Sequence, residues 1–410
     1  MKLSSQRVAA IAVAASLALA ACGGDDDDAD VTAPTVAPAT DPASPATDPA
    51  SPATDPASPA TDPAAPATDP AVDTPEIDYA GLTGELVGGG ASAQGAAIEA
   101  WKAGFGELAP NVTISYDTLG SGGGRSGFLD GSFDFAGSDA ALSEDEIATS
   151  IDRCAGDQGA INLPHYISPI AVAYNLPELD GAILNLTPEA VAGIFAGEIT
   201  NWNDAAIADA NPGVELPDRA INPVHRADKS GTSKNFTAYL EIVAPDIWTW
   251  GDIEDWEVEG PAGGEGANGT SGVVAAIQAG EGSIGYADAS QIEDLAAAAV
   301  GVGGEFVPYS AAAAAAVVDA SPRLEGRHEF DFSYDLKRDL PGTYPIVLVS
   351  YHIVCLQYAD QAKADAVRGF LTYVASPEGQ EAAAANAGSA PISDEVRAQL
   401  LEAIGSITAG

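Results

Sequence analysis

The sequence predicts an α/β fold divided into two lobes, preceded by a segment without a core. From about residue 78 onward, strand-like segments alternate with helix-like segments, an order typical of parallel sheets with right-handed crossovers. This part of the chain is about 330 residues long, more than a single core usually holds, so two lobes are expected. Between residues 23 and 77 the composition is too polar to build a core.

The first strands and helices are predicted from residue type and spacing. Residues 82–87 predict a strand that ends at Gly88, and residues 112–116 and 133–137 predict two more. Between the first two strands, apolar residues at helical spacing predict a helix with one buried face: Ile98, Trp101, Phe105 and Leu108. A second helix is expected to begin near Gly124.

Later segments continue the alternation. Residues 170–174 and 344–349 are predicted to be core strands because of their apolar content. Thr187 is a suitable N-cap for a helix whose first turn holds Pro188. Another helix is expected over residues 364–374.

The N-terminal residues 1–22 resemble a bacterial lipoprotein signal peptide. Two basic residues precede an apolar run, residues 8–21, which is shorter than the roughly 20 residues of a membrane-spanning helix. The run ends in Leu-Ala-Ala-Cys, a lipobox-like sequence, so Cys22 is predicted to carry a lipid. The alternative is an ordinary export signal with an incidental cysteine.

Residues 23–77 are predicted to form a disordered tether. A seven-residue repeat of Ala, Thr, Asp, Pro and Ser recurs here, and its prolines exclude a helix. Repeated acid and proline with few apolar residues are typical of an extended, solvated linker. The tether is expected to lift the folded part off a membrane surface, and the alternative is a tolerated low-complexity expansion.

The chain is strongly acidic, with 16 Lys and Arg against 60 Asp and Glu and a formal net charge of −44. Nucleic acid and anionic lipid bind basic surfaces, so neither is an expected electrostatic partner. A buried small anion is not excluded, because local donors and dipoles hold such a ligand irrespective of net charge.

Three cysteines are present, and Cys22 is assigned to the lipid. In an oxidising compartment the remaining Cys154 and Cys355 are expected to form a disulfide. The alternative is two buried free thiols that pack as small apolar residues.

Three clusters of glycine and hydroxyl residues stand at predicted strand-to-helix junctions: residues 90–94, 120–124 and 226–233. A helix start leaves N–H groups unpaired and carries a positive partial charge, serine or threonine adds a hydroxyl, and glycine permits close approach. If the three starts converge, they form a cage of donors for one tetrahedral anion, to which Arg226 adds a fork of N–H groups. Each cluster alone is also compatible with an ordinary cap and turn, and none has a Walker pattern.

Several segments together resemble the phosphate-binding proteins of bacterial phosphate ABC transporters, the PstS type. They follow one another in the family's order: residues 120–123, 137–142, 194–204, 226–233 and 282–286. The chain departs from the family pattern in its first turn, Ser92-Ala93, and at Lys229, where glycine is common.

The resemblance implies a two-lobed, hinge-closing α/β fold of the Venus-flytrap type, like the type II periplasmic binding proteins. One lobe is expected to comprise residues 78–165 and 335–405, and the other residues 166–334. Two chain crossings would let the lobes close around a ligand.

The resemblance also assigns a phosphate-binding role to eight residues: Ser92, Ala93, Ser121, Asp139, Arg226, Ser230, Gly231 and Thr232. Asp228 is expected to orient Arg226 and partly neutralise it. Asp139 is expected to accept the proton that phosphate carries at neutral pH and sulfate lacks, which would reject sulfate by roughly 10⁴ or more. The alternative for Asp139 is a cap on a helix beginning at Ala140.

The predicted function is therefore capture of inorganic phosphate outside the cytoplasm and delivery to the membrane permease of a phosphate ABC importer. The protein is expected to be a monomer anchored to the membrane through Cys22, with no nucleic-acid partner, cofactor or metal and no enzymatic activity. Its four histidines lack metal-ligand spacing. The alternatives are a secreted phosphatase, a surface phosphate sensor or adhesin, and a receptor for sulfate or molybdate.

Overall fold

A computed structural model describes residues 77–258 and 263–410 of the chain. The predicted signal peptide with Cys22 and residues 23–76 of the predicted tether lie outside the described residues. Within the described ranges, no helix is long and apolar enough to cross a membrane.

A mixed nine-stranded sheet runs through the described chain in the order β2-β1-β3-β12-β4-β8-β6-β7, and β9 also pairs with β4. The bounds are β1 Gly84–Gly90, β2 Val112–Thr118, β3 Phe135–Ser138, β4 Ala160–Tyr174, β6 Asn222–Arg226, β7 Glu265–Ala267, β8 Ser283–Asp288, β9 Ala296–Ala297 and β12 Val347–Cys355. Strand β1 pairs in parallel with β2 and β3, which confirms the predicted parallel arrangement of these strands.

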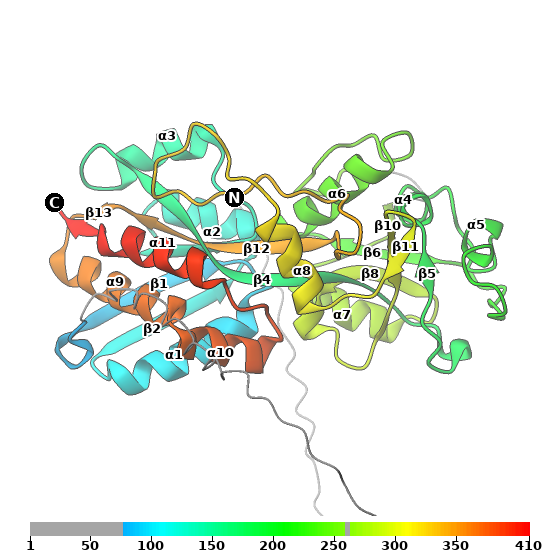
Figure 1. Cartoon of the computed structure of the whole chain (residues 1–410), viewed down its shortest axis with the longest axis horizontal. Helices are drawn as coiled ribbons and strands as arrows, with labels where there is room; N and C mark the ends of the chain where they lie inside the picture. Colours follow the sequence, from blue (N-terminus) through cyan, green and yellow to red (C-terminus); the bar gives the residue numbers. More distant parts are fainter. Residues whose placement is uncertain (1–76, 259–262) are drawn as a thin grey trace, which may run out of the picture. The chain divides into compact units, whose positions relative to one another are not determined.

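The first lobe is the half that carries β1–β3 and the helices around them (Figure 1). Its helices are α1 Gly95–Leu108, α2 Gly120–Leu129, α3 Glu144–Arg153, α9 Gln361–Ala375, α10 Pro377–Ala387 and α11 Asp394–Gly405. Helix α1 buries Trp101 and Phe105 completely, as its apolar spacing predicts, and the Trp101 indole donates to the carbonyl of Gly379 in α10 at 2.8 Å. Burial of each such aromatic side chain contributes about 1.5–3 kcal/mol.

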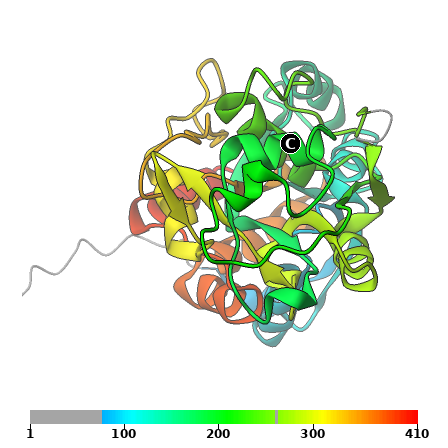
Figure 2. The same cartoon turned by 90° about the vertical axis from the view of Figure 1, so that its right-hand side faces the viewer.

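The second lobe is the half that carries β6–β8, and Figure 2 views the molecule from its side. Its helices are α4 Pro188–Phe195, α5 Ala205–Ala208, α6 Gly231–Val243 and α7 Gly269–Ala279. Thr187 caps α4 by accepting from the N–H of Ala190, as predicted. A small separate sheet joins β5 Asn185–Leu186, β10 Ala299–Val302 and β11 Glu305–Val307.

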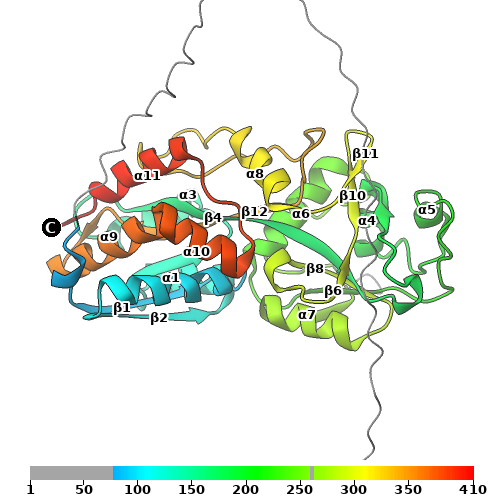
Figure 3. The ribbon, with the colours of Figure 1, turned by 60° about the horizontal axis from the view of Figure 1, so that its bottom comes forward.

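Two long buried strands, β4 and β12, connect the lobes (Figure 3). Residues 160–169 of β4 pair with β12, and residues 170–174 pair with β8 of the second lobe. A 15-residue strand therefore passes through the point where the sequence predicts the first boundary, between residues 165 and 166. Helix α8 Ala311–Asp319 lies near the middle of the molecule, before the chain returns to β12. The predicted boundaries stay predictions.

The short elements complete the description. They are the strands β13 Gln357–Tyr358 and β14 Thr408–Ala409, which pair in parallel, and the 3-10 turns η1 Tyr79–Gly81, η2 Pro177–Leu179 and η4 Ala289–Gln291.

Three sequence predictions of local structure are wrong. Strand β1 continues through Gly90 instead of ending at Gly88, because Gly89 and Gly90 pair with residues of both neighbouring strands, β2 and β3. Helix α2 begins at Gly120 instead of near Gly124. Leu108, predicted on the buried face of α1, is 44% exposed because the helix ends there.

Cys154 and Cys355 form a disulfide, with their Cα atoms 5.5 Å apart. Cys154 is the C-cap of α3 and Cys355 is the last residue of β12, so the bond fastens a helix to the sheet within the first lobe.

Candidate functional site

The helix starts predicted to form a site lie together between the lobes. The turn before α1 packs on the start of α2, since a Cβ placed on Gly124 would lie 2.5 Å from the Cα of Gly90. The start of α2 meets the start of α6, because the N–H of Gly122 donates to the carbonyl of Lys229 at 3.1 Å. A Cβ on Gly231 would lie 2.5 Å from the Ser121 hydroxyl. Glycine is therefore what permits these approaches.

Asp139 follows β3 and lies inside this cluster, with only 4% of its surface exposed. Its carboxylate accepts from the hydroxyl of Thr232 at 3.0 Å, and its backbone N–H donates to the Ser121 hydroxyl at 3.0 Å. The other carboxylate oxygen, Oδ1, is buried and has no hydrogen-bond partner among the described residues. The next helix, α3, begins five residues later behind its own cap, Ser143, so the helix-cap alternative for Asp139 is wrong.

Burial raises the pKa of Asp139 above its ordinary value. The hydroxyl of Thr232 and the positive charges of Arg226 and Arg125 act in the opposite direction and offset only part of that effect. A buried carboxylate with one unpaired oxygen is costly, unless a ligand supplies a proton to that oxygen.

Arg226 ends β6 and is 2% exposed. Its Nε donates to Asp228 at 2.7 Å, its Nη2 contacts the other oxygen of the same carboxylate, and its Nη1 lies 3.4 Å from the Thr232 hydroxyl. Burial acts to raise the pKa of Asp228, but its hydrogen bonds with Arg226 and the charge of that guanidinium outweigh burial and lower the pKa. Asp228 thus contacts Arg226 through both of its carboxylate oxygens and also accepts from the N–H of Gly269 at 2.9 Å.

The serine hydroxyls of the cluster accept hydrogen bonds from the protein. Ser121 accepts from the N–H of Asp139, and Ser230, the N-cap of α6, accepts from the N–H of Ser233 at 3.1 Å. A hydroxyl that accepts one bond keeps its own hydrogen for donation. Ser121 and Ser230 are therefore prepared as donors, which suits an anion.

A fourth helix start belongs to the cluster and was missed in the sequence. Thr270, in the first turn of α7, contacts Ser92 through its hydroxyl at 3.1 Å and its N–H at 3.0 Å. Gln291 donates to the carbonyls of Ser92 and Ala93, at 3.0 Å each. The segment Asn268-Gly269-Thr270-Ser271-Gly272 has the same composition as the three predicted clusters, and this signal could have identified it.

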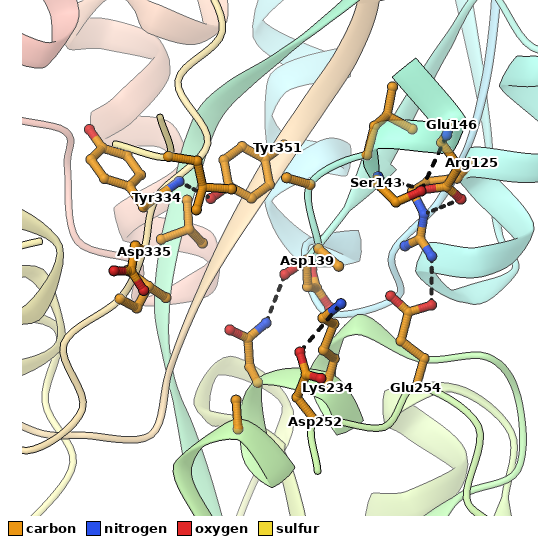
Figure 4. A pocket seen from close by; sticks show the side chains of 18 of the residues that line it. Arg125, Asp139, Ser143, Glu146, Lys234, Asp252, Glu254, Tyr334, Asp335 and Tyr351 are labelled. Atoms are coloured by element: carbon orange, nitrogen blue, oxygen red, sulfur yellow. Dashed lines mark hydrogen bonds and ion pairs between the residues drawn. The ribbon is translucent and has the colours of Figure 1, made fainter. Parts of the chain in front are cut away.

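A cavity of about 570 Å³ opens beside the cluster (Figure 4). Asp139 lines it, together with parts of α3, α6, β12 and residues 324–338. Its charged side chains balance among the described residues, with five of each sign: Arg125, Lys229, Lys234, Arg327 and Arg338 against Asp139, Glu146, Asp252, Glu254 and Asp335. This balance does not favour a second anion.

The histidines are placed as packing residues. His225 stacks on the ring of Trp256, with ring centroids 4.7 Å apart. His165 and His352 contact each other through their Nδ1 atoms at 3.2 Å in the core, and burial lowers the pKa of both. Within residues 77–258 and 263–410, no group of three or more His, Cys, Asp or Glu is arranged to hold a metal ion.

Comparison with known proteins identifies the family. A model of the PBP superfamily domain matches residues 60–378. The phosphate-binding protein PstS 3 of Mycobacterium tuberculosis is 36% identical over 331 residues, which cover 78% of this chain and 86% of that protein. PstS 2 of the same organism is 34% identical over 339 residues, covering 80% and 89%. The chain belongs to the PstS family of phosphate-binding proteins.

Solved structures share the fold of this PstS-family chain. PfluDING, a high-affinity periplasmic phosphate-binding protein solved with bound phosphate at pH 8.5, superposes with a TM-score of 0.63 at 24% identity, covering 77% of this chain and 93% of that one. A phosphate-binding protein from Stenotrophomonas maltophilia gives a TM-score of 0.60 at 22% identity, covering 78% and 93%. The predicted two-lobed solute-binding fold is confirmed.

Proposed function

We propose that this PstS-family protein binds inorganic phosphate between its lobes and delivers it to the permease of a phosphate ABC importer. The observation that carries the proposal is the convergence of helix starts around Arg226 and Asp139. Ser121, Ser230 and Arg226 are buried here, and one carboxylate oxygen of Asp139 has no hydrogen-bond partner among the residues that the structure describes.

The donors come from both lobes. In the first lobe, the hydroxyls of Ser92 and Ser121 and the backbone N–H of Ala93 face the anion. In the second lobe, the hydroxyl of Ser230 and the N–H of Gly231 belong to the start of α6, whose dipole favours negative charge. Thr232, the third residue assigned to the anion there, gives its hydroxyl hydrogen to Asp139 in this structure. Because neither lobe carries the full set, phosphate binding favours the closed arrangement of the two lobes.

Arg226 supplies the positive charge. Asp228 engages its Nε and Nη2, which leaves Nη1 and the outer edge of the guanidinium to meet a phosphate oxygen. A rigid guanidinium fork loses little freedom on binding and forms charge-assisted hydrogen bonds.

Asp139 supplies the selectivity. Its unpaired Oδ1 accepts the hydrogen of a protonated phosphate oxygen, which satisfies both groups. Sulfate has no hydrogen at neutral pH, so its oxygens would face a buried carboxylate unpaired.

We further propose that the protein acts outside the cytoplasm as a monomer attached to the membrane by a lipid on Cys22, with residues 23–77 as its tether. The lipobox-like sequence and the acidic, proline-rich composition support this arrangement. We propose a binding role over an enzymatic one because the hydroxyls of the cluster accept hydrogen bonds from the protein and keep their own hydrogens for an anion.

The test is calorimetric titration of the purified protein, freed of bound phosphate, with phosphate, sulfate, arsenate and molybdate at fixed ionic strength. Tight binding of phosphate and arsenate, with sulfate and molybdate bound more weakly by roughly 10⁴-fold or more, is expected. Arg226→Gln should abolish tight binding. Its matched control is Arg368→Gln, which removes a surface ion pair with Asp365 and should leave affinity unchanged.

Two outcomes would contradict the proposal. Binding of sulfate or molybdate as tight as that of phosphate would place the chain among receptors for unprotonated oxyanions. Steady release of phosphate from a phosphomonoester such as 4-nitrophenyl phosphate would indicate a phosphatase.

A further inference from the structure

One buried arginine in the first lobe forms ion pairs with two acids, one on a helix and one in a loop (Figure 4). Arg125 lies on α2 and is 3% exposed. Its Nε donates to Glu146 of α3 at 3.0 Å, and its Nη2 donates to Glu254 at 2.5 Å. Glu146 belongs to the first lobe, whereas Glu254 belongs to the second. The two ion pairs therefore differ in what they connect.

The pair of Arg125 and Glu254 is, within the described residues, the only ion pair that joins the lobes. Both side chains are shielded from solvent, with 4% and 11% of their surfaces exposed. A charge-assisted hydrogen bond between partly buried groups is stronger than a surface pair, because water and salt screen it less.

The pair is connected to the anion site on both sides. In the first lobe, Nη1 of Arg125 donates at 3.1 Å to the hydroxyl of Ser138, the residue before Asp139. In the second lobe, the carbonyl of Glu254 accepts at 3.0 Å from the N–H of Ser230, the N-cap of α6. The ion pair thus connects Ser138, next to Asp139 in the first lobe, with Ser230 at the start of α6 in the second. Neither Arg125 nor Glu254 is an expected ligand of the anion.

We propose that Arg125 and Glu254 form a latch that holds the lobes closed over the ligand and slows its release. The inference rests on the proposed phosphate binding and goes beyond it by naming what sets the lifetime of the complex. When the lobes separate, this pair breaks, while Arg125 keeps Glu146 and Ser138. Arg125 and Glu254 are positioning residues, since they act through Ser138 and Ser230.

The latch affects the two rates of binding differently. The ion pair exists only after closure, so its loss leaves the encounter of phosphate with the open protein unchanged. Opening becomes easier, and the dissociation rate rises. Removing one charge-assisted hydrogen bond of this kind corresponds to a change of about tenfold in an equilibrium constant.

Glu254→Gln and Glu146→Gln form a matched pair of variants. Each variant replaces one acid bound to Arg125 by a neutral side chain of the same shape. Only Glu254→Gln removes an ion pair that joins the two lobes. Rates of phosphate binding and release are measured by stopped flow, and affinity by calorimetry. For Glu254→Gln we expect release about tenfold faster with the association rate within about twofold of wild type, and for Glu146→Gln both rates within about twofold.

A double-mutant cycle separates the ion pair from its individual charges. Arg125→Gln and Glu254→Gln should each speed release, and the double variant should release phosphate no faster than the more affected single variant. If Arg125→Gln does not fold, the comparison of the two glutamine variants at Glu254 and Glu146 still decides the matter.

The possible failures are distinguishable. If wild-type protein does not bind phosphate, the proposed function fails. If wild-type protein binds phosphate and Glu254→Gln releases it at the wild-type rate, the latch alone is overturned. Equal acceleration by Glu146→Gln and Glu254→Gln would also overturn it, because Arg125 would then act through the electrostatics of the first lobe instead of across the lobes.

Discussion

The hydroxyl of Thr232, in the first turn of α6, donates to the carboxylate of Asp139 from the opposite lobe at 3.0 Å. This bond joins Asp139, which directly follows β3 in the first lobe, to the start of a helix 93 positions later in the chain. It occupies one carboxylate oxygen and leaves the other free to meet a ligand. The proposed selectivity of the site therefore depends on a single oxygen atom.

Asp139→Asn is expected to reduce the preference for phosphate over sulfate. Asparagine offers an N–H to an unprotonated oxygen and removes the negative charge, so sulfate is no longer repelled. A hydrogen bond to a charged group contributes about 1.5–3 kcal/mol, so the preference should fall on the order of 100-fold, while phosphate affinity falls by less. Competitive titrations of phosphate and sulfate at equal ionic strength measure both.

The control is the thermal unfolding of the variant without ligand, which should stay cooperative. An unchanged ratio of the two affinities would exclude Asp139 as the selective acceptor.

Gly231→Ala is expected to prevent full closure. The added Cβ would lie 2.5 Å from the Ser121 hydroxyl and 2.8 Å from the Cβ of Asp139, both on the opposite lobe. Such overpacking costs about 1–3 kcal/mol, so phosphate affinity should fall by roughly tenfold or more. The open protein avoids the contact, so unfolding without ligand should be unaffected.

Gly272→Ala in α7 is the matched control, because its added Cβ would lie 3.6 Å from the nearest atom, which is an ordinary contact. Calorimetry should show phosphate binding of wild-type strength for Gly272→Ala. Equal affinities of both variants would mean that the lobes do not approach as closely as the structure describes.

The sequence was sufficient to predict that a helix begins close to each of the three clusters, although α2 begins four residues earlier than predicted, since glycine and hydroxyl residues between a strand and a helix are a local signal. The start of α7 carried the same signal at Thr270. What the sequence could not provide is which of these starts meet, because that depends on how the lobes close. The extent of α2 was mispredicted for a related reason: glycine disfavours a helix interior, but here close packing of Gly124 on Gly90 requires it.

The ion pair of Arg125 and Glu254 shows the limit of local reasoning. The two residues are 129 positions apart, and neither lies in a segment whose pattern indicates a partner. Arg125 alone is compatible with a solvated helix residue, and Glu254 with a loop. Only the fold brings them together.

Removal of the disulfide is expected to lower stability without changing phosphate affinity. Cys154 and Cys355 are 201 positions apart, and a bond that closes so long a loop restricts the unfolded chain strongly. The double variant Cys154→Ser/Cys355→Ser should lose about 2–5 kcal/mol of unfolding free energy, measured by urea denaturation.

Phosphate affinity of this double variant should stay within about twofold, because both cysteines lie in the first lobe, away from the helix starts. Dithiothreitol should destabilise the wild type and leave the double variant unchanged. Equal sensitivity of both proteins to dithiothreitol would contradict the disulfide.

Asp288 is expected to make stability depend on pH. It ends β8, is fully buried, and accepts from the Tyr166 hydroxyl at 3.0 Å, while its Oδ2 has no partner among the described residues. Burial raises the pKa of Asp288 to about 7, and hydrogen bonds from Ser290 and Tyr166 offset only part of that effect. At pH 8 the folded protein therefore holds a buried charge at this position.

In the unfolded chain the same carboxyl has its ordinary pKa of 3.8, so between about pH 4 and pH 7 the folded state binds a proton that the unfolded state does not. The stability contributed by protonated Asp288 is complete below the unfolded pKa and is lost as pH rises through about 7. Each unit of pKa difference corresponds to about 1.4 kcal/mol.

Asp288→Asn isolates this contribution from that of two buried histidines. Burial lowers the pKa values of His165 and His352, so these residues destabilise the fold as pH falls below their ordinary pKa of 6.5. Both proteins contain these histidines, so the difference in unfolding free energy between wild type and variant cancels them. That difference should favour the wild type increasingly from pH 8 down to about pH 4, as measured by urea denaturation. A difference that stays constant over this range would mean that Asp288 has the same pKa in the folded and unfolded states, and that its burial is compensated by groups other than a bound proton.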